Sequence, residues 1–435
     1  DLAAASPATP PDFFAPARRH LPTSLPFCYI YTSGTTGMPK AVNITHAKFC
    51  SPGTKISFAY LRPGQDRNYC VLPLFHSAGG MIGSGMMLCG ITLIMRRKFS
   101  ARNFFPDCVK YKATVTQYIG ELCRYLVMAP ANPAADRAHR LRIAVGNGLR
   151  PEVWDDFQDR FNIPEIVEFY GATEGNGALL NHCTERGARG AVGRLGYFLR
   201  KLSGVKIVQF DVTDEAPVRD PATGFCLECA FGEPGEMLMP INDRNPFDGY
   251  KDAAATTKKI ARDVFTPGDA YFRTGDLLSH DSDGFYYFVD RIGDTFRWKG
   301  ENCSTTELAE VVSVFAGVAE CNAYGVSVPE NGDGRAPMVA ITPVAGDLAR
   351  IDLHALAQHV KRELPSYAVP MFLRILPASV ATTATFKHQK VALRKEGIDV
   401  AAIPDPLFWM NPETGAYEPF GTTELHRVVS KQARL

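Results

Sequence analysis

The sequence predicts an α/β protein made of three parts, and three observations support this prediction. Between residues 45 and 171, short apolar strands alternate with helical stretches, which is typical of a doubly wound, mostly parallel sheet. After about residue 201 the strands are short and turns are frequent, which favours an antiparallel sheet or small barrel. From about Gly293 a compact α+β unit follows. We expect an extended lead-in at 1–26, a large domain at 27–292 with the β-rich subdomain from about 201, and a C-terminal domain with its tail at 293–435.

Apolar runs and turn residues place the individual elements. The predicted strands are 27–30, 70–74, 90–95, 113–118, 141–145, 166–170, 338–343 and 371–376, and the predicted helices are 104–111, 120–128, 151–161, 305–315 and 353–364. Ser304 is a candidate N-cap, and Glu307 would complete a capping box. The most apolar stretch, 81–95, contains glycines and is short for a bilayer crossing, so we expect a buried helix followed by a strand.

Composition excludes several classes of function. The formal net charge of the 435-residue chain is +1, which provides no strong electrostatic reason to expect nucleic acid or an acidic membrane as a partner. The only close cysteine pair, Cys226 and Cys229, has no second pair at zinc-ligand spacing, so reduced intracellular thiols are the simpler interpretation. Residues 1–26 are rich in alanine and proline and lack the apolar core of a signal peptide.

A loop rich in hydroxyls and glycines follows the first predicted strand and suits a polyphosphate. Glycines free backbone N–H groups to point at a ligand, hydroxyls add donors, and the lysine adds charge. Met38 and Pro39 separate the second glycine from the lysine, so the loop is not a Walker A loop, and a plain polar turn is the alternative. The candidate phosphate-binding residues are Thr32, Ser33, Gly34, Thr35, Thr36, Gly37 and Lys40.

Further polar residues follow predicted strands or lie between the domains. Thr173 and Glu174 come after Gly171 at a strand end, where a hydroxyl and a carboxylate suit phosphate and Mg²⁺, or simply a turn. Asp276 follows a glycine turn and matches two ribose hydroxyls, with an ordinary turn aspartate as the alternative. Arg291 offers a planar donor group near Gly293, which suits a hinge; an inter-domain ion-pair cluster is the alternative.

A basic loop, Phe386-Lys387-His388-Gln389-Lys390, lies in the C-terminal domain. A lysine on a mobile loop there can reach a site built by the other domain, or belong to a solvated surface. Spacing does not choose between Lys387 and Lys390.

Taken in order, these motifs resemble the adenylate-forming superfamily of acyl-CoA synthetases, luciferase-like enzymes and peptide-synthetase adenylation domains. The resemblance runs from about residue 27 to 395 and rests on segments 31–40, 170–174, 271–276 and 290–300. Segments 118–126, 290–302, 385–390 and 405–410 are most similar to the fatty acid transport proteins, also called very-long-chain acyl-CoA synthetases.

The resemblance implies an adenylate-forming fold with a large α/β domain whose front part is missing, a small β subdomain and a C-terminal lid. It implies ATP, Mg²⁺ and coenzyme A, and a reaction in which a fatty carboxylate forms an acyl-adenylate before transfer to the thiol. Lys387 would neutralise charge in the transition state, His76 would orient the carboxylate, Thr173 would contact the α-phosphate and Glu174 would hold Mg²⁺. The residues implied for the nucleoside are Gly146, Asn147, Gly148, Phe169, Tyr170 and Gly171 at the adenine, and Asp276 and Arg291 at the ribose.

Lys299 and Gly300 would face the pantetheine tunnel after the lid rotates. Gly79, Gly80, Gly83 and Gly85 would make room for the acyl chain, or serve helix packing. The hinge position holds Gly293 where the superfamily usually has aspartate or lysine, so the usual polar hinge interactions are missing.

The family carries a substantial segment before the phosphate loop, so we expect a truncated or processed chain, with membrane association through that segment. Ala433-Arg434-Leu435 resembles a peroxisomal address, with plasma membrane, endoplasmic reticulum or lipid droplet as alternatives. The expected function is a long- or very-long-chain fatty acyl-CoA ligase. The alternatives are a fatty acid transport or binding protein and a catalytically silent form.

Overall fold

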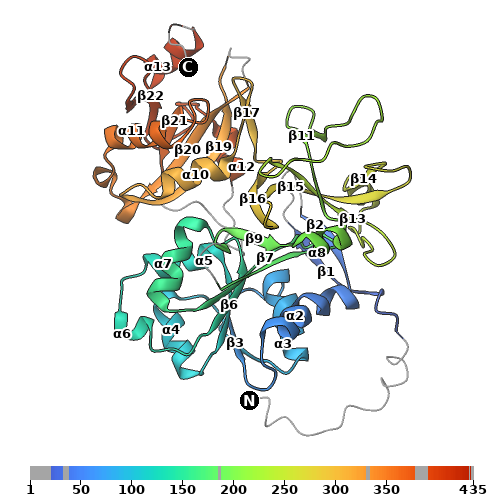
Figure 1. Cartoon of the computed structure of the whole chain (residues 1–435). Helices are drawn as coiled ribbons and strands as arrows, with labels where there is room; N and C mark the ends of the chain where they lie inside the picture. Colours follow the sequence, from blue (N-terminus) through green and yellow to red (C-terminus); the bar gives the residue numbers. More distant parts are fainter. Residues whose placement is uncertain are drawn as a thin grey trace.

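The computed structural model describes residues 21–32, 39–184, 188–329, 334–377, 390–430 and 432. Three groups of elements are visible in Figure 1: an α/β layer in blue and teal, a β-rich part in green and yellow, and an orange to red C-terminal unit. Among the described residues, no helix has both the length and the apolar character needed to cross a membrane. Within the same residues, no group of three or more His, Cys, Asp or Glu side chains is arranged to hold a metal ion by itself.

The α/β layer is a six-stranded sheet in the order β4-β3-β5-β6-β7-β8. All its neighbouring strands are parallel except β7 and β8, which confirms the mostly parallel sheet. Its strands are β3 (Arg67–Cys70), β4 (Thr92–Met95), β5 (Val115–Ile119), β6 (Ile143–Asn147), β7 (Glu165–Tyr170) and β8 (Leu179–Cys183). Its helices are α2 (His46–Tyr60), α3 (Ser77–Leu88), α4 (Ala101–Lys110), α5 (Gly120–Met128), α6 (Pro133–Asp136) and α7 (Pro151–Phe161).

Helices cover both faces of this sheet because successive strand residues point to opposite sides. One apolar cluster joins α4, α5 and α7 to Ala144 and Ile166, and another joins α2 and α3 to Val145 and Val167. Figure 1 shows α2 and α3 on one side of β3 and β6, and α4 to α7 on the other. The predicted helices 120–128 and 151–161 are confirmed at both ends.

The strand predicted at 70–74 is wrong, because β3 ends at Cys70. Pro73 has no N–H to donate to a neighbouring strand, and its carbonyl accepts a hydrogen bond from the His76 N–H at 3.2 Å. The chain therefore turns after β3, and α3 begins at Ser77 with His76 as its N-cap. The prediction of a buried helix followed by a strand within 81–95 is confirmed by α3 and β4.

The glycines of α3 serve close packing. A Cβ atom on Gly85 would lie 2.6 Å from the Cys50 carbonyl oxygen of α2, and one on Gly80 would lie 2.2 Å from the Leu74 carbonyl oxygen. Gly79 is equally tight against the Pro73 carbonyl oxygen, at 2.4 Å, whereas Gly83 has ordinary contacts. Of the two predicted roles, helix packing is therefore the one that the contacts of Gly79, Gly80 and Gly85 support.

The β-rich part is an antiparallel sheet in the order β10-β13-β15-β16-β9, with β14 beside β15, as the turn-rich sequence predicts. Because β9 belongs to it, the sheet begins before residue 201, earlier than predicted. Its elements are β9 (Ala191–Arg194), α8 (Tyr197–Ser203), β10 (Lys206–Val208), β13 (Gly235–Pro240), α9 (Ala253–Thr257), β14 (Ile260–Arg262), β15 (Ala270–His280) and β16 (Phe285–Arg291). Two short pairs lie outside this sheet, β11 (Phe210–Asp211) with β12 (Ala216–Pro217), and β1 (Pro26–Thr32) with β2 (Lys40–Thr45).

The C-terminal unit has an apolar core of its own, formed by residues between Phe296 and Val428. Its sheet has the order β19-β20-β21-β22-β23, in which only β20 and β21 are parallel. Its elements are the hairpin β17 (Phe296–Trp298) and β18 (Glu301–Cys303), α10 (Thr305–Ser313), β19 (Val318–Ser327), β20 (Arg335–Pro343), η3 (Val344–Gly346), η4 (Leu348–Arg350), α11 (Leu353–Glu363), β21 (Phe372–Ile375), α12 (Lys390–Glu396), β22 (Leu407–Met410), β23 (Tyr417–Pro419) and α13 (Thr422–Val429).

Asp290 connects β16 to the C-terminal unit. Its buried carboxylate accepts hydrogen bonds from the Thr305 N–H at 2.5 Å and the Thr305 hydroxyl at 3.1 Å, at the start of α10. Ser304 also caps this helix by accepting from the Glu307 N–H at 3.2 Å, as predicted. The Asp290 side chain therefore stabilises the junction between β16 and α10. Arg291, its neighbour, remains the candidate for ligand binding.

Candidate active site

The candidate site lies where β3, β6 and β7 end, at the carboxyl edge of the parallel strands. After these strands come Ser77 at the start of α3, Gly148 and Thr173. In open α/β sheets this edge is where ligands bind. The predicted residues that follow β6 and β7 are thus brought to one edge by the strand order.

Glu174 is held by three groups from distant parts of the chain. The Tyr250 hydroxyl donates to its Oε1 at 2.9 Å, and the Lys259 Nζ lies 3.9 Å from the same oxygen. The Lys48 Nζ donates to the Glu174 backbone carbonyl at 2.9 Å. Burial lowers the pKa of Lys48 to about 8, although Asp248 and Glu174 oppose this change. Glu174 is therefore fixed through both its backbone and its side chain.

Thr173 and His76 are joined through Ser77. The Ser77 hydroxyl oxygen lies 2.9 Å from the Thr173 hydroxyl oxygen and 3.5 Å from the His76 Nδ1. The same His76 nitrogen accepts from the Ala78 N–H at 3.4 Å at the start of α3. The strand-end loop after β7 and the N-terminus of α3 are thus in direct contact. Sequence reasoning missed Ser77, although its position next to His76 was an available signal.

The stems of the predicted phosphate loop are the ends of β1 and β2. Thr32 and Lys40 are direct partners in the antiparallel pairing of these strands. The predicted residues Ser33, Gly34, Thr35, Thr36 and Gly37 lie outside the described residues. The Lys40 Nζ lies 5.7 Å from the centre of the Tyr250 ring, whose hydroxyl donates to Glu174. Tyr250 therefore connects the loop stem to the Glu174 carboxylate.

Asp276 and Arg291 are cross-strand partners on β15 and β16. The Tyr170 hydroxyl donates to the Asp276 Oδ2 at 2.5 Å, which joins the end of β7 to β15. Burial raises the pKa of Asp276. The hydrogen bond from Tyr170 and the positive charges of Arg291 and Lys259 oppose this increase. Asp276 therefore lies close to a cation that helps to keep it ionised.

The side chains of Phe169 and Tyr170 do not line one common adenine pocket. The Tyr170 ring packs with Leu179 of β8 and with Phe272 of β15, whereas Phe169 packs against the cluster of α2 and α3. Neighbouring residues on a strand point to opposite faces, so the two rings are separated by β7 itself. The structure accordingly does not bring together this predicted pair.

A buried carboxylate shapes the end of β6, with Gly146 and Asn147, and the start of the loop that follows, with Gly148. Glu168 accepts a hydrogen bond from the Leu149 N–H at 3.2 Å, and its other oxygen accepts one from the Tyr118 hydroxyl. Gly148 has a φ of +74°, which favours glycine. Burial raises the pKa of Glu168 to about 8 despite these donors. Sequence reasoning missed Glu168, because it sits inside an apolar strand.

We expect Glu168→Gln to change how stability depends on pH. Because the pKa of Glu168 in the folded state is above its unfolded value, the folded state binds more protons between about pH 5 and 8, and stability falls as pH rises through this range. Urea unfolding at several pH values should show wild type losing up to about 1.4 kcal/mol per pH unit relative to the variant. Glu165→Gln, at the partly exposed start of the same strand, is the control, and parallel curves for wild type and Glu168→Gln would contradict this prediction.

The remaining predicted residues lie in the C-terminal unit. Lys299 and Gly300 form the exposed turn between β17 and β18, and Lys387 lies outside the described residues. The Lys390 Nζ donates to the Thr305 Oγ1 at 3.4 Å, and burial lowers its pKa, opposed by Asp294 and Asp290. Lys390 is thus engaged within its own unit, which leaves Lys387 as the candidate of the two.

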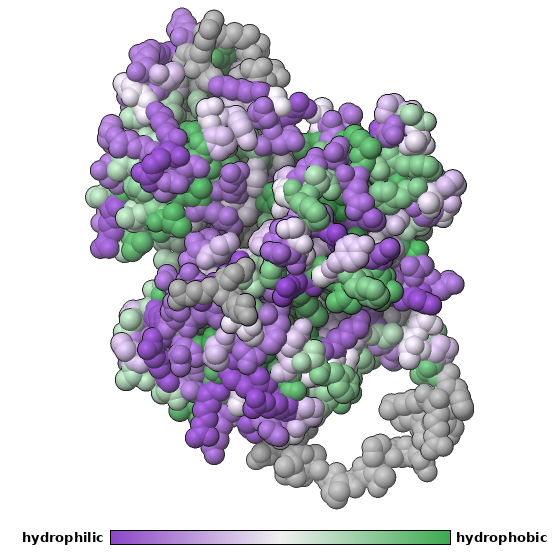
Figure 2. Space-filling view, viewed as in Figure 1, coloured by the Kyte–Doolittle hydropathy of each residue, from purple (hydrophilic) through white to green (hydrophobic). Residues whose placement is uncertain are grey.

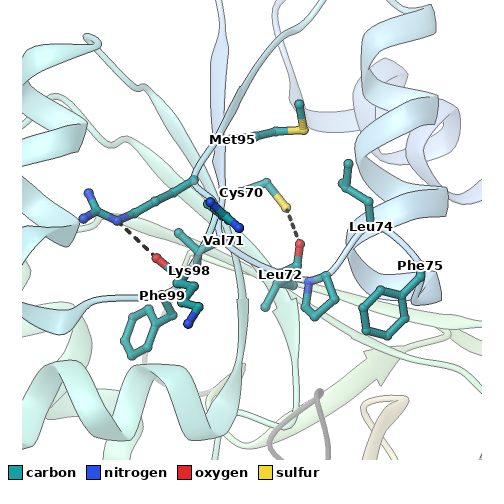
Figure 3. Close-up of a pocket in the computed structure, with 11 residues that line it drawn as sticks. Cys70, Val71, Leu72, Leu74, Phe75, Met95, Lys98 and Phe99 are labelled. Atoms are coloured by element: carbon teal, nitrogen blue, oxygen red, sulfur yellow. Dashed lines mark hydrogen bonds between the residues drawn. The ribbon is translucent and has the colours of Figure 1, made fainter.

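An open cleft of about 640 Å³ lies beyond the ends of β3 and β4. Figure 3 shows its lining, in which the Leu74 and Phe75 side chains come from the loop after β3, and Met95 and Lys98 from β4 and the segment that follows it. A small void beside it shares Leu72 and Pro73 and reaches His76. The cleft is therefore mostly apolar, has basic residues at one side and lies next to His76.

Comparison with known proteins defines the class. Residues 4–250 match the family described as AMP-binding enzyme, and residues 307–387 match the AMP-binding enzyme C-terminal domain. The chain belongs to the AMP-binding enzyme family.

Within this family the chain is similar to the long-chain fatty acid transport proteins. Long-chain fatty acid transport protein 3 of Homo sapiens is 44% identical over 411 residues, which cover 94% of this chain and 58% of that protein. Long-chain fatty acid transport protein 2 of Rattus norvegicus is 43% identical over 420 residues, covering 96% of this chain and 66% of that protein. The chain thus spans only part of the length of these relatives, and the family resemblance is confirmed.

Solved structures confirm the adenylate-forming fold. ATP-bound MatB from Rhodopseudomonas palustris superimposes with a TM-score of 0.69 at 21% identity, covering 86% of this chain and 69% of that one. MenE from Bacillus subtilis, in complex with ATP and magnesium ion, superimposes with a TM-score of 0.66 at 20% identity, covering 86% and 70%.

Proposed function

We propose that this chain activates a long-chain fatty acid with ATP to an acyl-adenylate and transfers the acyl group to coenzyme A. The observation that carries the proposal is the position of the Glu174 carboxylate. Glu174 follows Thr173 in the loop after β7, and its carboxylate is linked through Tyr250 to the stem of the phosphate loop. The solved structures of MatB with ATP and MenE with ATP and magnesium support a nucleotide in a site on this fold.

The charges around Glu174 suit a triphosphate with its metal. Glu174 would hold Mg²⁺, which neutralises phosphate charge when bound, and Thr173 would donate to the α-phosphate. The Lys48 and Lys259 ammonium groups both contact Glu174, and Lys40 lies at the loop stem. These cations offset the charge of a carboxylate and a triphosphate brought close together.

The nucleoside would lie between β7 and β15. Asp276 would accept hydrogen bonds from the ribose hydroxyls, and its bond from Tyr170 fixes the orientation of the carboxylate. Arg291, its cross-strand partner, would contact ribose or phosphate. The backbone of Gly146, Asn147 and Gly148, held through Glu168, would border the adenine.

The proposed reaction has two steps. A fatty carboxylate oxygen attacks the α-phosphorus, the bond to the β-phosphate breaks and pyrophosphate leaves. The coenzyme A thiol then attacks the acyl carbon, gives up its proton and displaces AMP. His76 would orient the carboxylate, which is already ionised near neutral pH, and the neighbouring apolar cleft would take part of the chain. Lys299 and Gly300 would border the pantetheine after the C-terminal unit, proposed to begin at residue 293, rotates.

Lys387→Ala tests the adenylation step. We expect a loss of fatty-acid-dependent AMP release on the order of a hundredfold or more, because the lysine would neutralise charge that grows in the transition state. The assay measures AMP with coenzyme A and fatty acids of increasing length. Lys395→Ala, an exposed lysine of α12, is the matched control. Wild type without fatty-acid-dependent AMP release, or an unimpaired Lys387→Ala, would refute the ligase.

A second candidate function is fatty acid transport or binding, favoured by the names of the relatives. It would gain support if Lys387→Ala, while unable to form the adenylate, still sustained fatty acid uptake in cells. We further propose the tail Ala433-Arg434-Leu435, outside the described residues, as a peroxisomal address.

A further inference from the structure

Helix α8 (Tyr197–Ser203) is apolar and yet lies on the surface. It has no buried residue, and the exposed fractions of its side chains are 73% for Tyr197, 80% for Phe198, 56% for Leu199 and 73% for Leu202. Phe231, from the loop before β13, is 57% exposed and lies beside it, because the Arg200 guanidinium stacks 5.2 Å from the Phe231 ring centre. Contiguous exposed apolar groups of this kind mark interaction sites.

The helix is held in place without burying these side chains. Figure 1 shows α8 following β9, beside the β-rich sheet. Gly204 ends the helix with a φ of +66°, packs against Pro240 of β13, and donates its N–H to the Arg200 carbonyl. The apolar side chains of α8 therefore remain available to a partner. Figure 2 shows apolar residues reaching the molecular surface among polar ones on the face in view.

The chain segment that contains α8 carries charge of one sign. From residue 191 to 208 the chain has four basic residues, Arg194, Arg200, Lys201 and Lys206, and no acidic one. Lys206 pairs with Glu228 at 2.8 Å, whereas Arg194 and Arg200 stack on phenylalanine rings. An apolar helix flanked by cations matches a surface with an apolar interior and anionic headgroups.

We propose that the α8 surface, defined as Tyr197, Phe198, Leu199, Leu202 and Phe231 with Arg200 and Lys201, docks on an anionic lipid bilayer. The aromatic and leucine side chains enter the interface, and the cations reach the headgroups. A second copy is a poorer occupant, because a symmetric contact would bring Arg200 and Lys201 against their own equivalents.

Docking on a bilayer does not depend on the proposed reaction. If the proposed function holds, however, docking would also bring the substrate close to the site. The Pro240 carbonyl, beside the end of α8, accepts a hydrogen bond from the Asn176 amide at 2.9 Å. Asn176 is two residues from Glu174, so a bilayer at α8 lies near the loop that would bind the metal. An amphipathic acid held in that bilayer would be close to the site.

Vesicle co-sedimentation of the full chain tests the proposal. We expect binding to vesicles of phosphatidylcholine with phosphatidylserine, weakening as salt rises, and little binding to phosphatidylcholine alone. Phe198→Ser and, separately, Leu202→Ser should each weaken binding roughly tenfold, and Lys201→Gln about fivefold. Phe58→Ser in α2 is the matched control, because Phe58 is also 80% exposed, and it should bind like wild type.

Several outcomes would overturn the proposal. They are equal binding by Phe198→Ser and wild type, an equal loss in Phe58→Ser, and equal binding to neutral and anionic vesicles. Light scattering that shows a wild-type dimer and a Phe198→Ser monomer would assign the surface to a second copy instead. Thermal unfolding confirms that each variant is folded, and ATP–pyrophosphate exchange in detergent solution separates a docking defect from a failure of the proposed reaction.

Discussion

Replacing Glu174 by glutamine is expected to slow fatty-acid-dependent ATP–pyrophosphate exchange on the order of a hundred- to a thousandfold. The amide removes the negative charge that would hold Mg²⁺, while keeping a similar shape and an oxygen for the Tyr250 hydroxyl. The Lys48 bond to the backbone carbonyl is unaffected, so the loop should keep its position. Exchange measured over a range of Mg²⁺ concentrations should show a higher requirement for the metal.

Glu165→Gln provides the control, since it makes the same change at the start of β7, the strand that precedes Glu174, where Glu165 pairs with His182 at 2.9 Å. It should retain wild-type exchange. If Glu174→Gln were as active as wild type at ordinary Mg²⁺ concentrations, Glu174 would not be the metal ligand.

Gly120→Ala should destabilise the protein by about 3 kcal/mol or more and weaken ATP binding with it. A Cβ atom at this position would lie 1.5 Å from the Gly148 carbonyl oxygen and 3.0 Å from the Leu149 nitrogen. Both are backbone atoms of the loop after β6, so no side-chain rotation relieves the clash. Either α5 or the proposed adenine loop must move.

Urea unfolding and equilibrium ATP binding measure the two effects. Gly196→Ala is the matched control, because nothing lies within 4 Å of its added Cβ and its φ is −58°. That substitution should leave stability within about 0.5 kcal/mol of wild type. A Gly120→Ala protein with normal stability and normal ATP binding would show that the packing of α5 against Gly148 does not constrain the loop.

Much of the fold follows from local patterns. The helices at 120–128 and 151–161 were predictable because their apolar spacing and flanking residues agree with the final packing. The strand predicted to continue after Cys70 was wrong. Val71 and Leu72 are as apolar as strand residues, but Pro73 has no N–H to donate to a neighbouring strand. The role of the α3 glycines was ambiguous, because the sequence does not show which atoms lie next to a glycine Cα.

The sequence by itself indicated the short motifs that we propose to carry the chemistry, including Thr173, Glu174 and Asp276, because each combines a suitable side chain with a turn. Only the tertiary structure decided which groups surround them. Lys48, Tyr250 and Lys259 have no local signal and come from positions far from Glu174 along the chain. The order and direction of strands bring them to one edge, and the alternation of β7 sends Phe169 and Tyr170 to opposite faces. A short sequence motif specifies residue types. Which distant side chains meet the motif in space depends on contacts between elements that lie outside it.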